Sequence, residues 1–187
     1  SVMGVGVNPT RTGLLDALER MGARVERAQL REDAGEPSGD VTVVGPDRLA
    51  AVEIPEAWLP RMIDEVPAWA VAAARAAGTS RLRGAAELRV KESDRLAAIC
   101  GNLSRLGIAA HEREGGFDIE GGEPQGGTVD AGGDHRIAMA FAALGTFARG
   151  PLIIDGAGGI ATSDPAFVDT LASLGGHVTA RTMESAA

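Results

Sequence analysis

One pattern recurs along this chain of 187 residues: an apolar helical repeat, then a glycine, then a strand-like segment. Its copies cover residues 14–25, 96–108 and 167–178. Apolar residues spaced three and four apart predict an amphipathic helix in each copy, and the glycine that follows is typical of a helix C-cap. Repeated supersecondary units predict a shared core, which restricts the fold more than any other feature of the sequence.

The rest of the chain fits the same arrangement. Two alanine-rich helices, a short strand after each and two further strands are predicted over residues 67–77, 135–147, 80–83, 151–155, 41–44 and 116–119. The order helix, strand, strand, helix, strand is then seen about two and a half times. We therefore predict an α/β domain with an incomplete third unit, turns at 35–39 and 121–127 inside the units, and a disordered tail over 182–187.

Composition narrows the class of protein. A net charge of −8 disfavours a nucleic-acid surface and favours a cytoplasmic protein. No apolar run is long enough to cross a bilayer. The single cysteine, Cys100, lies in an apolar helical pattern, which predicts a core position in a reducing compartment. Because the chain begins with a strand-like segment and no initiator methionine, we expect a piece of a longer protein.

Arginines stand near three predicted helix starts, at Arg11, Arg95 and Arg136. A cation there is repelled by the positive end of the helix dipole, which costs about 0.3–1 kcal/mol of stability. An anion in front of each helix would explain why arginine stands there, because the free backbone N–H groups and the guanidinium would both bind the anion.

The first polar cluster runs from Arg89 to Arg95 and contains Lys91, the only lysine of the chain. If a helix begins near Ser93, Lys91 lies in the turn before it, and Glu92 would either stay ionised or move protons. The lysine point charge and the arginine fork both suit phosphate or carboxylate groups. On the residues alone, a solvated charge run capped at Ser93 or Asp94 is the alternative.

Two further clusters precede helices. Asp134 is expected to cap the helix after it, His135 would be an acid, a base or a packed polar residue, and Arg136 would face a ligand or a carboxylate. Asp64 and Glu65 would be two acids favoured at a helix start. Alternatively, Asp64 would be a general base beside a bound hydroxyl.

Four segments in this order resemble the 5-enolpyruvylshikimate-3-phosphate (EPSP) synthase family. They are Asn8-Pro9-Thr10-Arg11-Thr12-Gly13, Met62-Ile63-Asp64-Glu65-Val66-Pro67, Leu88-Arg89-Val90-Lys91-Glu92-Ser93-Asp94-Arg95 and Asp134-His135-Arg136-Ile137-Ala138-Met139. The resemblance implies a protein of two domains. Each would be an inside-out α/β barrel of three βαβαββ units, with the active site between the domains. Residues 1–181 would be the carboxy-terminal domain, which pairs with the amino-terminal domain of the same protein.

The family transfers the enolpyruvyl group of phosphoenolpyruvate to shikimate 3-phosphate, a step of the shikimate pathway to the aromatic amino acids. The resemblance implies that Asp64 is the base for the 5-hydroxyl and Glu92 a proton donor to the methylene. It implies that Lys91 contacts substrate and intermediate, and that Arg95 and Arg136 bind phosphoenolpyruvate. No metal or organic cofactor is implied.

Three positions depart from the family pattern. Thr162 stands where many members carry another lysine for phosphoenolpyruvate, and Asp164 stands where an aromatic residue usually precedes the proline. Glu87 stands where many members have asparagine against the substrate. An acid near an anion site repels the ligand unless its carboxylate caps a helix instead.

Two other functions stay open. One is the UDP-N-acetylglucosamine enolpyruvyl transferase of peptidoglycan synthesis, which shares the fold, and the other is a non-catalytic module that binds phosphorylated metabolites. For an enzyme fragment, we expect the helix starts at Arg11, Arg95 and Arg136 to converge on one open face. We also expect Lys91, Arg95 and Arg136 to be fully solvated there, and the chain alone to fold without turning over.

Overall fold

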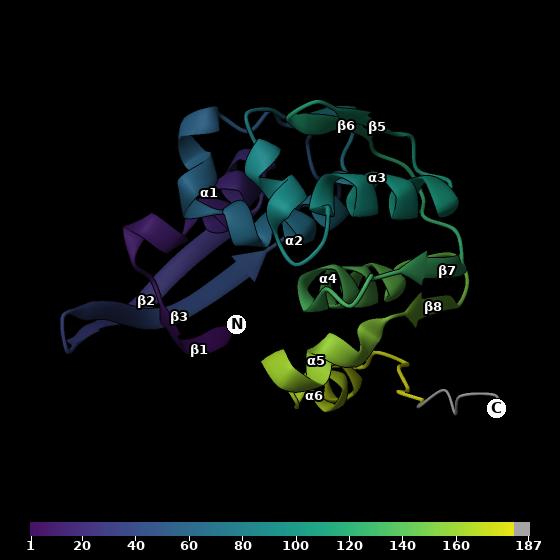
Figure 1. Ribbon diagram of the computed structural model, residues 1–187. Helices are drawn as coiled ribbons and strands as arrows, with labels where there is room; N and C mark the ends of the chain where they lie inside the picture. The colour runs from purple at the N-terminus through teal and green to yellow at the C-terminus, as the bar shows by residue number, and fades with distance from the viewer. Residues whose placement is uncertain (182–187) are drawn as a thin grey trace.

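The structure is a computed structural model that describes residues 1–181 (Figure 1), so the predicted tail over 182–187 lies outside the described residues. Helices and short strands alternate, as in a mixed α/β protein. The strands are β1 (Val2–Gly6), β2 (Arg24–Asp33), β3 (Glu36–Val44), β4 (Thr79–Leu82), β5 (Ala110–Arg113), β6 (Gly116–Glu120), β7 (Gly127–Asp130) and β8 (Leu152–Asp155). The α-helices are α1 (Gly13–Arg20), α2 (Val66–Ala73), α3 (Arg95–Arg105), α4 (His135–Gly145), α5 (Ile160–Ser163) and α6 (Phe167–Ser173). Short 3-10 helices are η1 (Pro9–Arg11), η2 (Glu56–Arg61), η3 (Ile63–Glu65), η4 (Ala86–Val90) and η5 (Ala157–Gly159).

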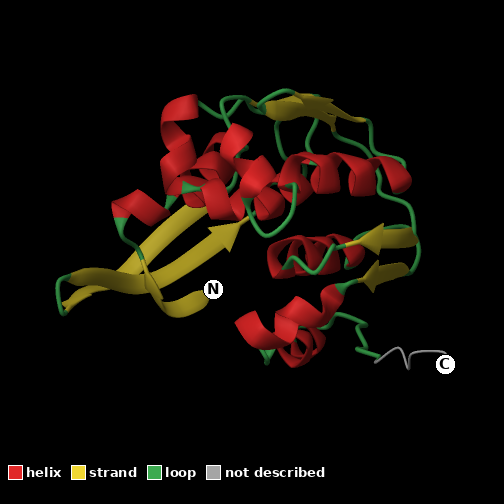
Figure 2. Cartoon of the chain, in the orientation of Figure 1, coloured by secondary structure: helices red, strands yellow, loops and turns green. Residues whose placement is uncertain are grey.

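The strands form three small sheets (Figure 2). Two are antiparallel, with the strand orders β1-β3-β2 and β4-β6-β5. In the third, β7 pairs in parallel with β8, and α4 makes the crossover that a parallel pair requires. The long β2–β3 hairpin extends away from the helices (Figure 1).

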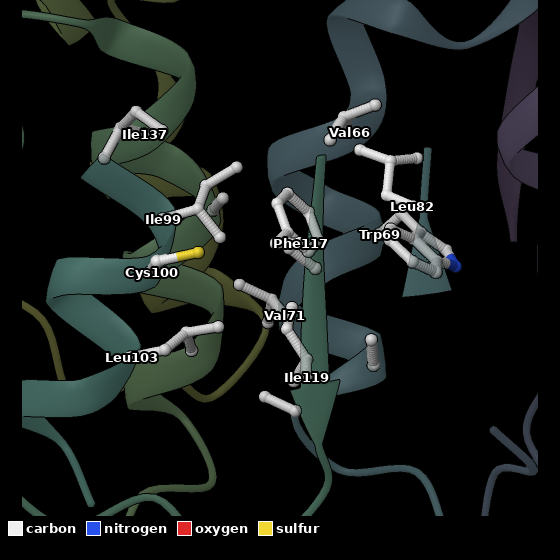
Figure 3. Close-up of a cluster of buried hydrophobic side chains, with 14 of the residues drawn as sticks. Val66, Trp69, Val71, Leu82, Ile99, Cys100, Leu103, Phe117, Ile119 and Ile137 are labelled. Carbon is white, nitrogen blue, oxygen red and sulfur yellow. The ribbon is translucent and has the colours of Figure 1, made fainter. Parts of the chain in front are cut away.

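The core lies between the helices and the inner strands (Figure 3). Helix α2 is apolar around most of its circumference, and six of its eight residues are buried, because it packs against α4, α3 and β6. The rings of Trp69 on α2 and Phe117 on β6 stack with centroids 6.0 Å apart. Cys100 on α3 is buried in the same cluster, which confirms its predicted position.

The predicted helix ends are confirmed where glycine marks them. Gly22, Gly107 and Gly175 follow the helices of the recurring pattern with φ of 98°, 78° and 95°, in the left-handed region that a C-cap glycine adopts. The alanine-rich helices are shorter than predicted, because α2 ends at Ala73 and α4 at Gly145. Beyond these residues the backbone continues in turns, in which the Ala76 N–H donates to the Ala73 carbonyl and the Phe147 N–H to the Leu144 carbonyl.

Two other predictions were wrong. Residues 176–181 carry no strand, so the strand expected around Val178 is absent from the described part of the chain. Gly39 lies inside β3, because its lack of a side chain lets the strand pass close to the Ala28 carbonyl at a register shift in β2. Within residues 1–181, no helix combines the length and the apolar character needed to cross a membrane.

Candidate active site

The starts of α2, α3 and α4 lie together and are joined by ion pairs. Arg95 begins α3 and pairs with Asp134, the residue that caps α4. Arg136, in the first turn of α4, pairs with Asp64 just before α2. The fold therefore brings together residues from three segments that are separated by up to 72 positions in the sequence.

The side chain of Arg95 is completely buried, and those of Arg136 and Lys91 are 34% and 24% exposed, so the prediction that all three are fully solvated on an open face is wrong. Its Nε donates to Asp134 Oδ2 at 2.8 Å, and its Nη2 donates to Glu92 Oε2 at 2.6 Å. Its Nη1 has no hydrogen-bond partner among the described residues, and the Asp64 carboxylate lies 3.5 Å away. A buried cation needs such partners because the interior does not solvate it.

Asp64 lies between the two arginines. One carboxylate oxygen is 3.5 Å from Nη1 of Arg95, and the other is 3.8 Å from Nη2 of Arg136. Arg136 also donates to the backbone carbonyl of Asp64 at 3.1 Å, and Glu65 lies 3.9 Å from its Nη1. About a third of the Arg136 side chain is exposed, so this arginine is the part of the pair that an incoming anion can reach.

Asp134 is the structural centre of the cluster. Its side chain caps α4, as predicted, by accepting the N–H groups of Arg136 at 2.9 Å and Ile137 at 3.4 Å. It also accepts the Ser93 hydroxyl and the Arg95 guanidinium. Burial by itself would raise the pKa of Asp134, but Arg95 and these hydrogen bonds hold the pKa below its usual value.

Lys91 lies beside this cluster and pairs with Glu87 at 2.5 Å. The hydrogen bond that Lys91 donates to Glu87 is the largest cause that raises the pKa of Lys91, and the nearby Asp64 carboxylate adds to it. Glu87 also lines a hollow of about 280 Å³ next to Ile63, the neighbour of Asp64 in sequence. The carboxylate that replaces the family's asparagine is therefore a partner of Lys91 in this structure.

The remaining candidates lie around these residues. His135 is half-buried at the first position of α4. Thr162 is exposed, and its hydroxyl donates to the Gly159 carbonyl at 2.8 Å. The Asp164 carboxylate accepts the Ala166 N–H at 3.1 Å in the turn before α6, which is a capping contact. Arg11 is exposed in η1, and no ion pair joins it to the cluster within residues 1–181, so its convergence stays a prediction.

The cluster holds more acids than bases. Its ion pairs connect three cations, Lys91, Arg95 and Arg136, to five carboxylates, those of Asp64, Glu65, Glu87, Glu92 and Asp134. The anions that the arginines were predicted to face are thus the chain's own carboxylates. An anionic ligand has to displace some of them, or additional cations have to come from outside these residues.

Sequence reasoning missed that Ser93 and Glu65 join the cluster, where Glu65 lies 3.9 Å from Nη1 of Arg136. Of the two caps predicted for α3, Asp94 is the cap, because it accepts the Ala97 N–H, and the Ser93 hydroxyl instead donates to Asp134 at 3.0 Å. No local signal marks such a contact, because Ser93 and Asp134 are 41 positions apart.

Comparisons with known proteins identify the family of the chain. Residues 1–171 match the family model described as EPSP synthase (3-phosphoshikimate 1-carboxyvinyltransferase). The 3-phosphoshikimate 1-carboxyvinyltransferase of Nitrosococcus oceani is 47% identical over 171 residues, which are 91% of this chain and 38% of that protein.

Solved structures show the same fold. The EPSP synthase of Acinetobacter baumannii superposes with a TM-score of 0.89 at 37% identity, over 95% of this chain and 41% of that one. The enolpyruvyl transferase NikO of Streptomyces tendae superposes at 0.72 over 97% of this chain and 40% of that one, and at 21% identity it shares the fold alone. This chain spans about 40% of the length of the relatives that it matches. By its sequence and its fold, the chain belongs to the EPSP synthase family.

Proposed function

We propose that the protein containing this chain transfers the enolpyruvyl group of phosphoenolpyruvate to the 5-hydroxyl of shikimate 3-phosphate and releases phosphate. This chain supplies one half of the site. The observation that carries the proposal is the Asp64 carboxylate, held between Arg95 and Arg136 where three helices begin. A base beside fixed cations suits the attack of a hydroxyl on an anionic acceptor.

In the proposed reaction, Asp64 takes the proton of the 5-hydroxyl, and the oxygen attacks the enolpyruvyl carbon. Glu92 delivers a proton to the methylene, which becomes a methyl group in a tetrahedral intermediate. The intermediate then expels phosphate and loses a methyl proton, so the double bond forms again. Lys91 contacts the substrate and the intermediate. Neither a metal nor an organic cofactor takes part in these steps.

The ion pairs define what must change when substrates bind. Glu92 pairs with Arg95 at 2.6 Å, and Asp64 lies against both arginines. We propose that the phosphate and carboxylate groups of phosphoenolpyruvate take over part of Arg95 and Arg136, which frees Glu92 and Asp64 for proton transfer. Arg136 presents the exposed side of this position, and Arg95 lies beneath it.

We propose a supporting role for the other candidates. Asp134 positions Arg95, Glu87 holds Lys91, and His135 and Thr162 lie at the edge of the substrate position. Asp134 is buried against Arg95, and Glu87 contacts Lys91. The Thr162 hydroxyl cannot replace the charge of a lysine, so we expect the other half of the site to compensate for it.

The whole protein is proposed to be a cytoplasmic enzyme of two domains, and residues 1–181 form its carboxy-terminal domain. The amino-terminal domain is the proposed partner, and neither nucleic acid nor membrane is. We also propose that the domain is an inside-out α/β barrel of three βαβαββ units, the third incomplete. Two sheets of three strands and one sheet of two strands support this division.

An assay with two acceptors tests the function. The protein that carries residues 1–187 together with an amino-terminal half is incubated with phosphoenolpyruvate and either shikimate 3-phosphate or UDP-N-acetylglucosamine, and phosphate release is measured. We expect release with shikimate 3-phosphate alone. Release with the nucleotide sugar alone would favour the peptidoglycan enzyme, and release with neither would favour a binding module.

A further inference from the structure

Three ion pairs join residues within the segment 87–95, which carries Lys91 and Glu92. They are Glu87 with Lys91, Arg89 with Asp94, and Glu92 with Arg95. The first and the last belong to the cluster described above. The middle pair is different, because Arg89 also contacts the β5–β6 hairpin and no group of the cluster.

Arg89 uses four of its five N–H donors across this junction. Its Nε donates to the Glu114 carbonyl at 3.0 Å, and its Nη2 donates to the Arg113 carbonyl at 2.8 Å. Its Nη1 donates to the carboxylates of Glu112 at 2.7 Å and Asp94 at 3.0 Å. Three of these acceptors belong to the β5–β6 hairpin, and the fourth, Asp94, precedes α3. One guanidinium therefore fixes the position of the hairpin relative to the start of α3.

Asp94 connects this guanidinium to α3. One of its oxygens accepts from Arg89, and the other accepts the Ala97 N–H at 3.1 Å and caps the helix whose first residue is Arg95. The hydrogen bond with Glu112 is the largest cause that raises the pKa of Arg89, so the side chain stays charged. These ion pairs are partly exposed and contribute little to stability, which makes geometry the main consequence of the arrangement.

We propose that Arg89 is a positioning residue that holds the turn 91–94 between the β5–β6 hairpin and the start of α3, and thereby sets where Lys91 and Glu92 stand. The proposal rests on the proposed function for its kinetic consequence only. A lysine cannot replace Arg89, because its single ammonium cannot bridge four acceptors in a planar fork.

The position of Lys91 can be followed by a label on lysine, because Lys91 is the only lysine of the chain. Growth with ε-13C-labelled lysine gives the 187-residue chain one signal, whose pH titration follows the Lys91–Glu87 pair. The variants are Arg89→Gln, Arg89→Met and the matched control Arg113→Gln, none of which adds a second lysine. The Arg113 side chain contacts Asp118 on the same hairpin at 2.7 Å and 3.0 Å, and makes no hydrogen bond to the segment 87–95 within the described residues.

We expect the titration midpoint of Lys91 to fall toward its ordinary value in Arg89→Gln and Arg89→Met, and to stay unchanged in Arg113→Gln. Thermal unfolding of all variants checks that they are folded. If Arg89→Gln does not fold, Glu112→Gln removes only one of the four acceptors and is expected to shift the midpoint in the same direction. An unchanged midpoint in the folded Arg89 variants overturns the proposal.

The kinetic arm uses the two-domain protein. Because misplacement of reacting groups by about 1 Å costs up to roughly a hundredfold in rate, we expect kcat to fall at least about tenfold in Arg89→Gln, with a smaller change in KM. Arg113→Gln should keep the wild-type kcat. Equal kcat values in the two variants overturn the proposal. If the wild-type protein shows no transfer, the proposed function fails, and the Lys91 titration still decides the role of Arg89.

Discussion

At the scale of residues, two arginines and two aspartates form the centre of the site: Arg95 contacts Asp134 and Asp64, and Asp64 also contacts Arg136. Asp64, Lys91, Glu92, Arg95 and Arg136 lie in one cluster, as their motifs predict. The burial of Arg95 was not predictable, because its main partner, Asp134, is 39 positions away and no local pattern marks such a pair.

Asp64 and Lys91 should be needed for the reaction and dispensable for the fold. Both are partly exposed, and the buried Arg95 keeps Glu92 and Asp134 as partners when Asp64 is replaced. In the two-domain protein, Asp64→Ala is expected to lower kcat by about 10²–10⁴, as the loss of a general base does, and Lys91→Met should also remove most activity. Circular dichroism should match the wild type. Near-normal turnover in either variant would exclude that residue from the mechanism.

Asp134 should matter for stability, in a way that depends on pH. Removal of one partner of a buried ion pair costs about 3–5 kcal/mol, so Asp134→Ala should lower the free energy of unfolding by about that amount near pH 7. Because the folded-state pKa of Asp134 lies below its ordinary value, its contribution is complete above about pH 4 and is lost as the pH falls below that value.

Urea titrations between pH 2.5 and pH 7 measure this contribution. The wild type should lose stability as the pH falls from about 4 to 2.5, and Asp134→Asn should lose less. The loss that remains in Asp134→Asn is due to groups such as Asp118, whose pKa Arg83 and Arg113 also hold low despite its burial. Equal losses in both proteins would contradict the account.

Cys100 should be unreactive in the folded chain. Burial is the largest cause that raises the pKa of its thiol to about 12, so little nucleophilic thiolate exists at pH 8. A thiol reagent such as DTNB should therefore modify one thiol per chain in denaturant and almost none without it. Rapid modification of the native chain would show that α3 does not pack as described.

At the scale of elements, the sequence predicted positions better than lengths. The helices of the recurring pattern end near the glycines that predict their ends, because only glycine adopts the left-handed conformation there without strain. The alanine-rich helices end before the predicted residues, and the Ala77 N–H donates to the Leu49 carbonyl instead of continuing α2. The strand expected near Val178 is absent because β7 and β8 pair without a further strand in residues 1–181.

Substitution of two glycines by alanine tests the packing of these elements, because the free energy of unfolding is expected to rise in one variant and to fall in the other. Gly101 lies on the exposed face of α3 with open space around it, so Gly101→Ala should stabilise the fold by up to about 1 kcal/mol. At Gly116 on β6, a methyl group would overlap the backbone carbonyl of Leu82, so Gly116→Ala should destabilise it by about 1–3 kcal/mol. Chemical unfolding measures both, and shifts of the same sign would contradict the packing of β6 against β4.

At the scale of the whole molecule, charge explains why one half of the site should not work alone. The cluster holds five carboxylates and three cations, and its buried arginine already has acidic partners. Phosphoenolpyruvate and shikimate 3-phosphate are both polyanions, so this surface by itself does not attract them. If they are the substrates, as we propose, the cations that favour their binding come from the proposed opposite domain, which would also hold the reacting groups in register.

Complementation tests this central claim most directly. Phosphate release from phosphoenolpyruvate and shikimate 3-phosphate is measured for the 187-residue chain alone, and for the chain joined to the amino-terminal half of a relative such as the Nitrosococcus oceani enzyme. The joined protein carrying Asp64→Ala is the control for background release. The account predicts no release by the chain alone and release by the joined protein that depends on Asp64. Turnover by the chain alone, or release that persists in the Asp64→Ala control, would contradict it.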